Sequence, residues 1–366
     1  MSVDTRSEPT APTIRGRHIL RLGPSSWVVR PRMLITVIVG LVIMVVLFLT
    51  SVGVSDYPLN PIDVARILLG GGTRIENVVV FDVALPRALV SLLVGFGFGL
   101  AGALTQMIAR NPLATPDILG ITAGAGAAAV AAIAFSSTWG AWFADIGVPA
   151  AALLGGLVTA LLMYVLAWPG RRANADIDPF RLVIIGVGMT WMLQALTSYM
   201  LTRARIDDAA RAQVWLVGSV SQATWSDVWP ALIAFVLGLV MVIGLARPIG
   251  VLGLGPDLAR GLGVRSGPAT TAILLTAVVV AALCVSAAGP IAFVALLAPQ
   301  IALRLTRSST PTPLASGITG AILVLGGDLL CRTVLPGGLP VGVVTAAIGG
   351  PFLIYLMISM SRKASA

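Results

Sequence analysis

The sequence is poor in the residue types that carry polar chemistry. Of its 366 residues, 15 are Asp or Glu, two are Cys and one is His, and Lys363 is the sole lysine. This excludes an internal G-x-x-x-x-G-K-[ST] phosphate loop, so any ATP must bind another chain. His18 stands alone, and no His, Cys or carboxylate cluster is present that would bind a bare metal ion. We expect no metal site and no cofactor in this chain.

Cys284 and Cys331 lie in or beside apolar stretches. A thiol there usually behaves as a small buried hydrophobe, so we expect no disulfide and no redox role. The net charge of +9 comes from basic residues at the ends of apolar runs, without a stripe or an aromatic-interleaved patch. This distribution argues against nucleic acid as a partner.

Apolar sequence, by contrast, is abundant. Hydrophobic residues make up 57% of the chain and charged residues 11%, with a mean hydropathy of +0.97, which no soluble domain of this length would show. A spanning helix needs roughly 20 apolar residues, and we count about ten such stretches. The fold class is therefore an all-α polytopic membrane protein, in contact with lipid. The expected spans are residues 33–53, 84–107, 118–136, 147–168, 181–201, 228–246, 269–288, 291–303, 314–331 and 341–360.

One transmembrane domain, residues 33–361, is expected between a polar N-terminal tail, residues 1–32, and a short C-terminal tail, residues 362–366. With the N-terminus in the cytoplasm, 17 of the 24 Lys and Arg residues fall in cytoplasmic breaks and tails or, for Arg181, at the cytoplasmic end of a span. The positive-inside rule favours this orientation, which places both termini in the cytoplasm. Residues 61–69 form an amphipathic pattern that we expect to lie on the membrane surface.

A polar break at residues 110–117 separates two of the most apolar, glycine-rich runs. It contains two prolines and an ionisable pair, Arg110 and Asp117. Non-helical backbone at membrane depth is tolerated where it lines a cavity or is buried in protein. Two interpretations stay open: a segment that lines a path, and a plain turn capped by Asn and Asp with proline stops.

Six sequence blocks carry a family resemblance. They are LPR (85–87), GALTQ (102–106), NPLATPDILG (111–120), VWLVGS (214–219), GPIAFVALLAP (289–299) and LPVGVVT (339–345). In this order they resemble the membrane permease subunits of bacterial ABC importers for ferric siderophores, vitamin B12 and haem. A finer likeness, through residues 180–188 and the run that ends at Pro299, is to the second permease subunit of ferric enterobactin importers.

The resemblance implies the ten-helix, type II ABC importer permease fold and no enzyme activity. It implies a subunit that translocates a ferric siderophore across the cytoplasmic (inner) membrane by alternating access, while ATP and Mg²⁺ are bound by a partner, a cytoplasmic ABC ATPase dimer. The other implied partners are a homologous second permease subunit, which would make a heterodimer, and an extracytoplasmic siderophore-binding protein. A vitamin B12 or haem permease is the alternative within the family.

The resemblance also places an inner gate. Asn111 and Leu113 match the residues that narrow the path there, and Phe180 lies at a helix start where relatives have a second constriction. Gln106, one turn before the polar break, is a further path candidate. It faces either the path or a helix partner, and the sequence does not decide between them.

Coupling to the ATPase is expected in the longest cytoplasmic break, residues 247–267. Pro256 suits a first helical position, and Asp257 suits the positive N-terminal end of a short helix. In relatives the matching segment is the coupling helix; an ordinary amphipathic loop is the other interpretation. The residues assigned to coupling are Asp257, Leu258, Ala259, Arg260 and Gly263.

Arg87 and Arg332 are assigned to docking of the binding protein. In the family, arginines at these mouths meet carboxylates of the binding protein, and such charge pairs mainly steer and orient the partners. Interfacial snorkelling is the alternative for each. One departure from the family is Gln300, which stands where relatives commonly have histidine.

Two other classes of function fit the sequence less well. A stand-alone secondary transporter is disfavoured because the spans show no obvious intramembrane relay of Asp, Glu or His, which proton-coupled carriers tend to need. A membrane-embedded enzyme is the weakest hypothesis, because carboxylates cluster outside or at the edges of spans and no metal-ligand spacing occurs.

Overall fold

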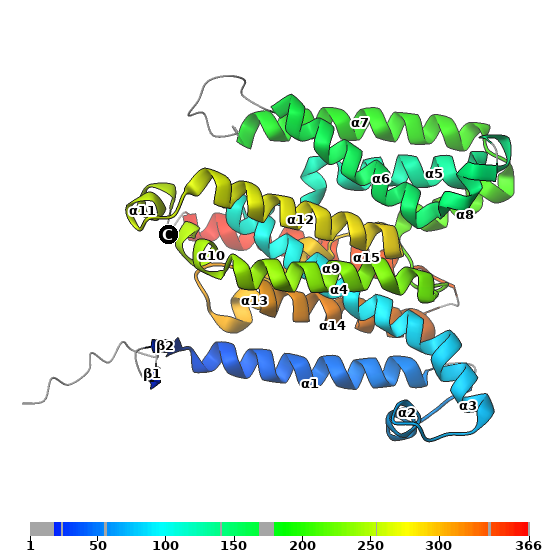
Figure 1. Cartoon of the computed structure of the whole chain (residues 1–366), viewed down its shortest axis with the longest axis horizontal. Helices are drawn as coiled ribbons and strands as arrows, with labels where there is room; N and C mark the ends of the chain where they lie inside the picture. Colours follow the sequence, from blue (N-terminus) through cyan, green and yellow to red (C-terminus); the bar gives the residue numbers. More distant parts are fainter. Residues whose placement is uncertain are drawn as a thin grey trace, which may run out of the picture.

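The computed structural model describes residues 18–22, 25–54, 57–139, 141–167, 179–253, 255–335 and 338–364. Within these ranges the chain forms a bundle of long helices that run roughly side by side (Figure 1). Each long helix overlaps one of the expected spans. They are α1 (Pro31–Gly53), α4 (Leu85–Ala109), α5 (Ile121–Trp139), α6 (Ala141–Ala167), α7 (Pro179–Arg203), α9 (Trp225–Gly244), α12 (Ser266–Ala288), α13 (Val294–Thr306), α14 (Pro313–Thr333) and α15 (Val341–Ala364).

The predicted all-α polytopic fold is confirmed. Eight of the described helices are long and apolar enough to cross a membrane, and α5 and α13 supply two shorter apolar helices. A helix rises 1.5 Å per residue, so the 13 residues of α13 reach only about 20 Å, less than a hydrocarbon core of about 30 Å. The chain therefore enters α13 from a non-helical segment inside the bundle.

Short elements mark the two ends of the bundle. We call one the α2 end, because it carries α2 (Pro61–Leu68) and α3 (Arg74–Val78), and the other the α11 end, because it carries α10 (Ala246–Leu252) and α11 (Pro256–Gly261) (Figure 1). The surface helix expected at residues 61–69 is present as α2.

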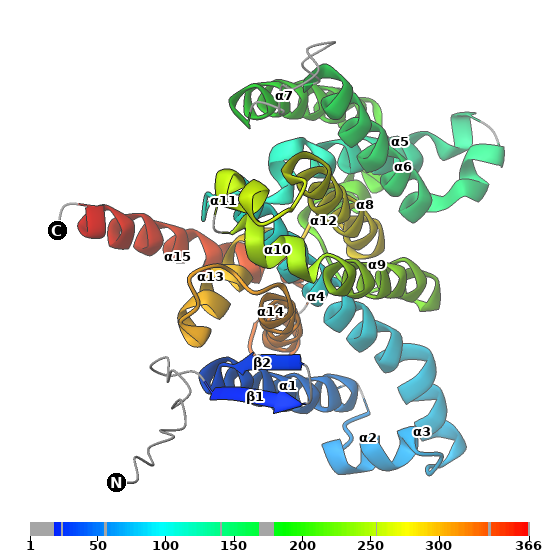
Figure 2. The same cartoon turned by 60° about the vertical axis from the view of Figure 1, so that its left-hand side comes forward.

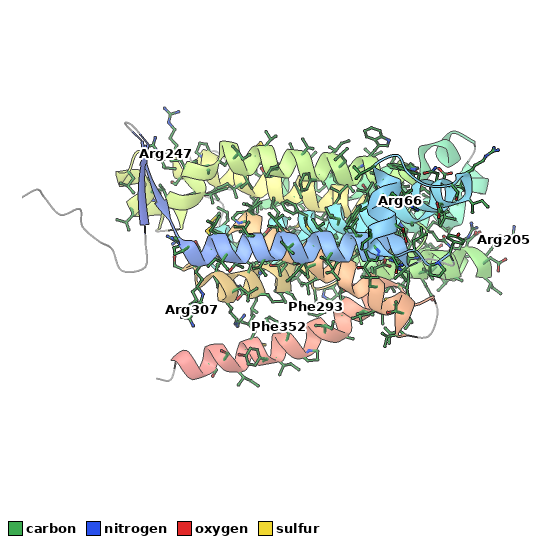
Figure 3. The ribbon with its side chains drawn as sticks, turned by 90° about the horizontal axis from the view of Figure 1, so that it is seen from below. Arg66, Arg205, Arg247, Phe293, Arg307 and Phe352 are labelled. Atoms are coloured by element: carbon green, nitrogen blue, oxygen red, sulfur yellow. The ribbon has the colours of Figure 1, made fainter. Side chains whose placement is uncertain are left out.

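Exposed arginines lie at both of these ends. Figure 3 shows Arg66 and Arg205 at the α2 end and Arg247 and Arg307 at the α11 end. The C-terminal end of α15 also lies at the α11 end, and Figure 2 shows α15 diverging from the bundle as it approaches that terminus.

Helix α4 forms the centre of the bundle. It packs against α14, α12, α9 and α13, and most of its residues are buried. Glycine allows this close packing: a Cβ atom on Gly102 would lie 1.8 Å from the Ala295 carbonyl oxygen, and one on Gly95 would lie 2.5 Å from that of Gly320. Because lipid gives helices little hydrophobic reason to associate, such close approach supplies the packing energy.

Several short elements were not predicted, α3 and α10 among them. An antiparallel hairpin, β1 (His18–Leu22) with β2 (Ser25–Val29), lies inside the segment that was expected to be a plain tail. A π-helix, η1 (Val79–Ala84), leads into α4, and α8 (Ile206–Val217) follows α7. The charged residues of α8 lower its hydropathy, so a search of the sequence for apolar spans does not find it. Cys284 and Cys331 are free and buried, as expected.

Candidate functional site

A hollow of about 660 Å³ lies among α4, α5, α7, α8, α13 and α15. Most of its lining is apolar or backbone, from residues such as Phe98, Leu216 and Pro290. Its polar side chains come from η2 (Pro116–Leu119), α5 and α7, and no basic residue is among those that line it. They are Asp117, Thr122, Thr190, Gln194 and Thr197.

The polar groups of the hollow are suited to hydrogen bonding and not to metal ligation. Thr122 donates a hydrogen bond to the Asp117 carboxylate, and Thr197 donates to the Leu193 carbonyl at 2.8 Å. The side chain of Gln194 is exposed. In the described part of the chain, no group of three or more His, Cys, Asp or Glu residues could hold a metal ion. Such a lining can contact a large polar solute weakly along one side.

Among the described residues that line the hollow, Asp117 is the one ionisable group. Its side chain is open to the hollow, but the surrounding protein reduces its hydration. This desolvation raises the pKa of the Asp117 carboxyl above its ordinary value, and the hydrogen bond from Thr122 opposes the shift.

The backbone of the polar break brings Asp117 to this position. α4 ends where Arg110 takes a left-handed conformation (φ 48°), and the Asn111 side chain then accepts a hydrogen bond from the Leu113 amide at 2.9 Å. Pro116 starts η2, and Gly120 (φ 66°) turns the chain into α5. The break is thus an Asn-capped turn with proline stops, which was the second of the two interpretations offered by the sequence. It also contributes a side chain to the hollow, so the two interpretations are compatible.

Val217, Pro290 and Gly342 of the lining belong to a backbone junction of three chain segments. The Gly342 amide donates to the Gly218 carbonyl at 3.1 Å, and the Ser219 amide donates to the Ala288 carbonyl at 2.9 Å. A Cβ atom on Gly342 would lie 1.9 Å from the Val217 carbonyl oxygen, and one on Gly218 would lie 2.5 Å from that of Pro290. Only glycine permits these contacts. The sequence blocks contain these glycines, but their meeting could not be predicted.

Gln106 faces a helix partner. Its side chain is 3% exposed, donates a hydrogen bond to the Leu296 carbonyl at 3.1 Å and accepts one from the Gln300 amide at 2.7 Å. Gln300, at the position where relatives commonly have histidine, therefore forms an uncharged link between α13 and α4. Among the residues that line the hollow, Gln106, Asn111 and Leu113 do not appear. Phe180 lies in the first turn of α7, but its side chain is outside the described residues.

A buried ion cluster lies at the α2 end. The Asp328 side chain, 2% exposed, contacts Arg87 at 2.7 Å and Arg332 at 2.8 Å. Arg332 also donates to the Val54 carbonyl and to the Ser51 hydroxyl, both at 2.6 Å. Val54 follows the last turn of α1, so Arg332 satisfies a carbonyl that the helix itself leaves unpaired. The cluster joins α1, α4 and α14.

This geometry changes how the two expected docking residues are interpreted. The Arg87 and Arg332 side chains are only 20% and 16% exposed, and both are engaged with Asp328. Any partner carboxylate would have to compete with Asp328, so docking stays a prediction. Asp328 lies inside the expected span 314–331 but was not among the predicted functional residues, because a single carboxylate does not make a relay. Its spacing from Arg332, one helical turn, was the available signal.

The expected coupling segment folds as a short surface helix. α11 follows Gly255 (φ 120°), begins at Pro256 and ends at Gly261, and Gly263 (φ 79°) closes the turn after it. The two faces of α11 differ in exposure. The Leu258 side chain is 60% exposed and Arg260 is exposed, whereas Ala259 is fully buried. The Asp257 side chain lies outside the described residues. α11 can therefore present an apolar, basic face to a partner.

Known proteins resemble this chain over nearly its whole length. The sequence profile of the FecCD transport family matches residues 43–359. The iron(3+)-hydroxamate import system permease protein FhuG of Bacillus subtilis (strain 168) is 37% identical over 331 residues, which cover 89% of this chain and 97% of that protein. The ferric enterobactin transport system permease protein FepG of Escherichia coli (strain K12) is 38% identical over 298 residues, with coverage of 81% and 87%.

A solved structure shares the fold. It is described as an inward-facing conformation of a metal-chelate type ABC transporter, and it matches with a TM-score of 0.72 at 25% sequence identity. The match covers 88% of this chain and 98% of that one, so the helical arrangement is shared over most of this chain.

Proposed function

The chain belongs to the FecCD transport family, and from this premise we propose that it translocates a ferric siderophore across the bacterial inner membrane by alternating access. The family match supports a multi-pass permease subunit of an ABC importer for chelated iron. It is a transport subunit and not an enzyme; ATP is hydrolysed by the ATPase of such an importer.

The family match over residues 43–359 carries the proposal, because it takes in nearly all of the apolar chain. The names of two relatives point to different chelates of ferric iron, a hydroxamate and enterobactin. What they have in common is the class, a ferric siderophore. The hollow beside α4 suits such cargo, since its lining offers weak polar contacts and, in the described residues, no cluster that would strip the metal from its chelate.

We place the α11 end in the cytoplasm. The positive-inside rule favours this orientation, because most of the chain's Lys and Arg residues fall in the breaks and tails at that end. The C-terminal end of α15 lies there as well (Figure 1). The hollow would then lie on the path between the two faces, with the turn at residues 110–117 as its inner gate. Asn111 and Leu113 would act there.

The partners follow from this orientation. The ATPase dimer would meet α11 through Leu258 and Arg260, since the first of these is an exposed apolar side chain. The siderophore-binding protein would dock at the α2 end, where Arg87 keeps part of its surface open. A homologous second permease subunit would complete a heterodimer and close the hollow from its open side.

Uptake of labelled ferric siderophores by intact cells tests the proposal. Deleting this chain, or inactivating ATP hydrolysis in the partner, should abolish uptake of at least one ferric siderophore. A panel that includes a hydroxamate, a catecholate and a citrate chelate would identify the cargo. Uptake that persists without ATP hydrolysis and collapses with the proton gradient would instead identify a secondary transporter.

A further inference from the structure

A second hollow, of about 410 Å³, lies at the α11 end between the junction of α9 with α10 and the start of α12. Two of its lining residues are arginines, Arg247 and Arg265, and both are exposed. Among the described residues that line it, none is acidic. The hollow is separate from the one beside α4 and plays no part in the proposed path.

The charge of this hollow is not neutralised from within the described chain. Among the side chains that the structure describes, no carboxylate forms an ion pair with Arg247 or Arg265. The N-terminal end of α12 adds to the positive potential, because its first turn has no acidic residue and no side-chain cap. Two cations and the positive end of a 23-residue helix therefore face one opening.

The rest of the lining is apolar and lies at the level where a span begins. Ala269 and Ala272 belong to the first two turns of α12, and Leu245 directly follows the last residue of α9. α9 and α12 are both helices of spanning length. The arginines therefore lie at the membrane boundary, and the apolar wall leads from them toward the hydrocarbon.

We propose that this hollow binds an anionic phospholipid, with the phosphate of the headgroup between Arg247 and Arg265 and an acyl chain along Ala269 and Ala272. Arginine pairs phosphate oxygens with several N–H donors in a fixed geometry, and basic pockets beside spanning helices recognise anionic headgroups. An acidic partner protein could also pair with the two arginines, but the apolar wall continues along the spanning helix α12, where an acyl chain lies and a soluble protein does not. A free phosphate ion would leave that wall exposed. The inference goes beyond the proposed transport function and needs only the α11 end at an anionic membrane face.

The test uses the purified full-length chain in a neutral detergent. It is titrated with phosphatidylglycerol or with phosphatidylcholine of the same acyl chains, and bound lipid is counted by native mass spectrometry. We expect selective binding of phosphatidylglycerol. Near an anionic surface each arginine changes affinity about fivefold, so Arg247→Gln or Arg265→Gln should weaken binding about fivefold and the double variant about 25-fold. Arg66→Gln with Arg205→Gln, two exposed arginines of the α2 end, is the matched control and should bind as wild type (Figure 3).

Two further arms separate the possible occupants. Ala272→Phe fills the apolar wall without changing charge and should also weaken phosphatidylglycerol binding. Inorganic phosphate at the lipid's concentration should not displace it. The proposal is overturned by equal binding of the two lipids, by equal losses in the control pair, or by displacement with phosphate, which would identify a soluble-anion site. It is also overturned if the double variant binds lipid normally but loses the ATPase on co-purification, which would identify a protein contact.

Discussion

Two pairs of arginines, one at each end of the bundle, are used in opposite ways. At the α2 end, Arg87 and Arg332 are turned inward and share the buried Asp328 carboxylate, and Arg211 on α8 pairs with Asp208. At the α11 end, Arg247 and Arg265 border an open hollow with no acidic residue among its described lining. Arg87 and Arg332 join α1, α4 and α14, whereas the Arg211–Asp208 pair lies within α8. Arg247 and Arg265, by contrast, are available to bind a group outside the chain.

The strongest test of this comparison removes the shared carboxylate. Asp328→Ala leaves two mostly buried arginines without a counter-charge, which typically costs about 3–5 kcal/mol of the free energy of unfolding. We expect a large fall in thermal stability of the detergent-solubilised chain. Asp63→Ala is the matched control, since its partner Arg66 is 60% exposed and a surface pair contributes at most about 1 kcal/mol. Equal losses in the two variants would show that the cluster does not hold the α2 end.

A second test asks whether the α11 end is the side that partners use. Leu258→Asp places a charge on an exposed apolar side chain of α11 and should reduce co-purification of the ATPase about tenfold, as for an interface residue worth more than 1 kcal/mol. Leu69→Asp changes an even more exposed leucine, at the α2 end, and should leave co-purification intact. If both variants retain the ATPase, the contact lies elsewhere and α11 is an ordinary loop helix.

The hydrogen bond between Gln106 and Gln300 allows a further test, because it joins two helices without any charge. Gln106→Ala leaves the buried Gln300 amide without its acceptor, at a cost of about 1–3 kcal/mol. Because neither residue carries a charge or titrates, the loss should not depend on salt or on pH between 5 and 8, as urea unfolding can measure. Gln194→Ala, at an exposed position beside the main hollow, is the control. The double variant Gln106→Leu with Gln300→Leu should recover most of the stability.

The smallest effect is expected at Arg307. It caps α13 in a left-handed conformation (φ 49°) with an exposed side chain, and glycine adopts that conformation freely. Arg307→Gly should therefore change the free energy of unfolding by no more than about 0.5 kcal/mol, whereas Arg332→Gly should cost several times more. A large loss at Arg307 in thermal unfolding would mean that arginines of the α11 end also hold the fold together.

The sequence predicted the helices well, because long apolar runs and their proline and glycine boundaries are local signals. α11 was expected from Pro256 and the glycines after it, and α2 from its amphipathic pattern. What stayed hidden depends on distant contacts. Arg87 and Asp328 lie 241 residues apart, and the partner of Gln106 is 194 residues away. Sequence composition does not show which distant residues meet in the fold. A search for apolar spans also gives little weight to a single aspartate near the end of a helix.

The junction of Gly218, Pro290 and Gly342 carries a mechanical consequence. No side chain separates the three chain segments there, because backbone contacts backbone directly. Elsewhere in a protein, a displacement between neighbours can be absorbed by a change of rotamer. Here that adjustment is missing, so α8, the entry to α13 and the start of α15 must be displaced as one rigid unit whenever the path changes shape.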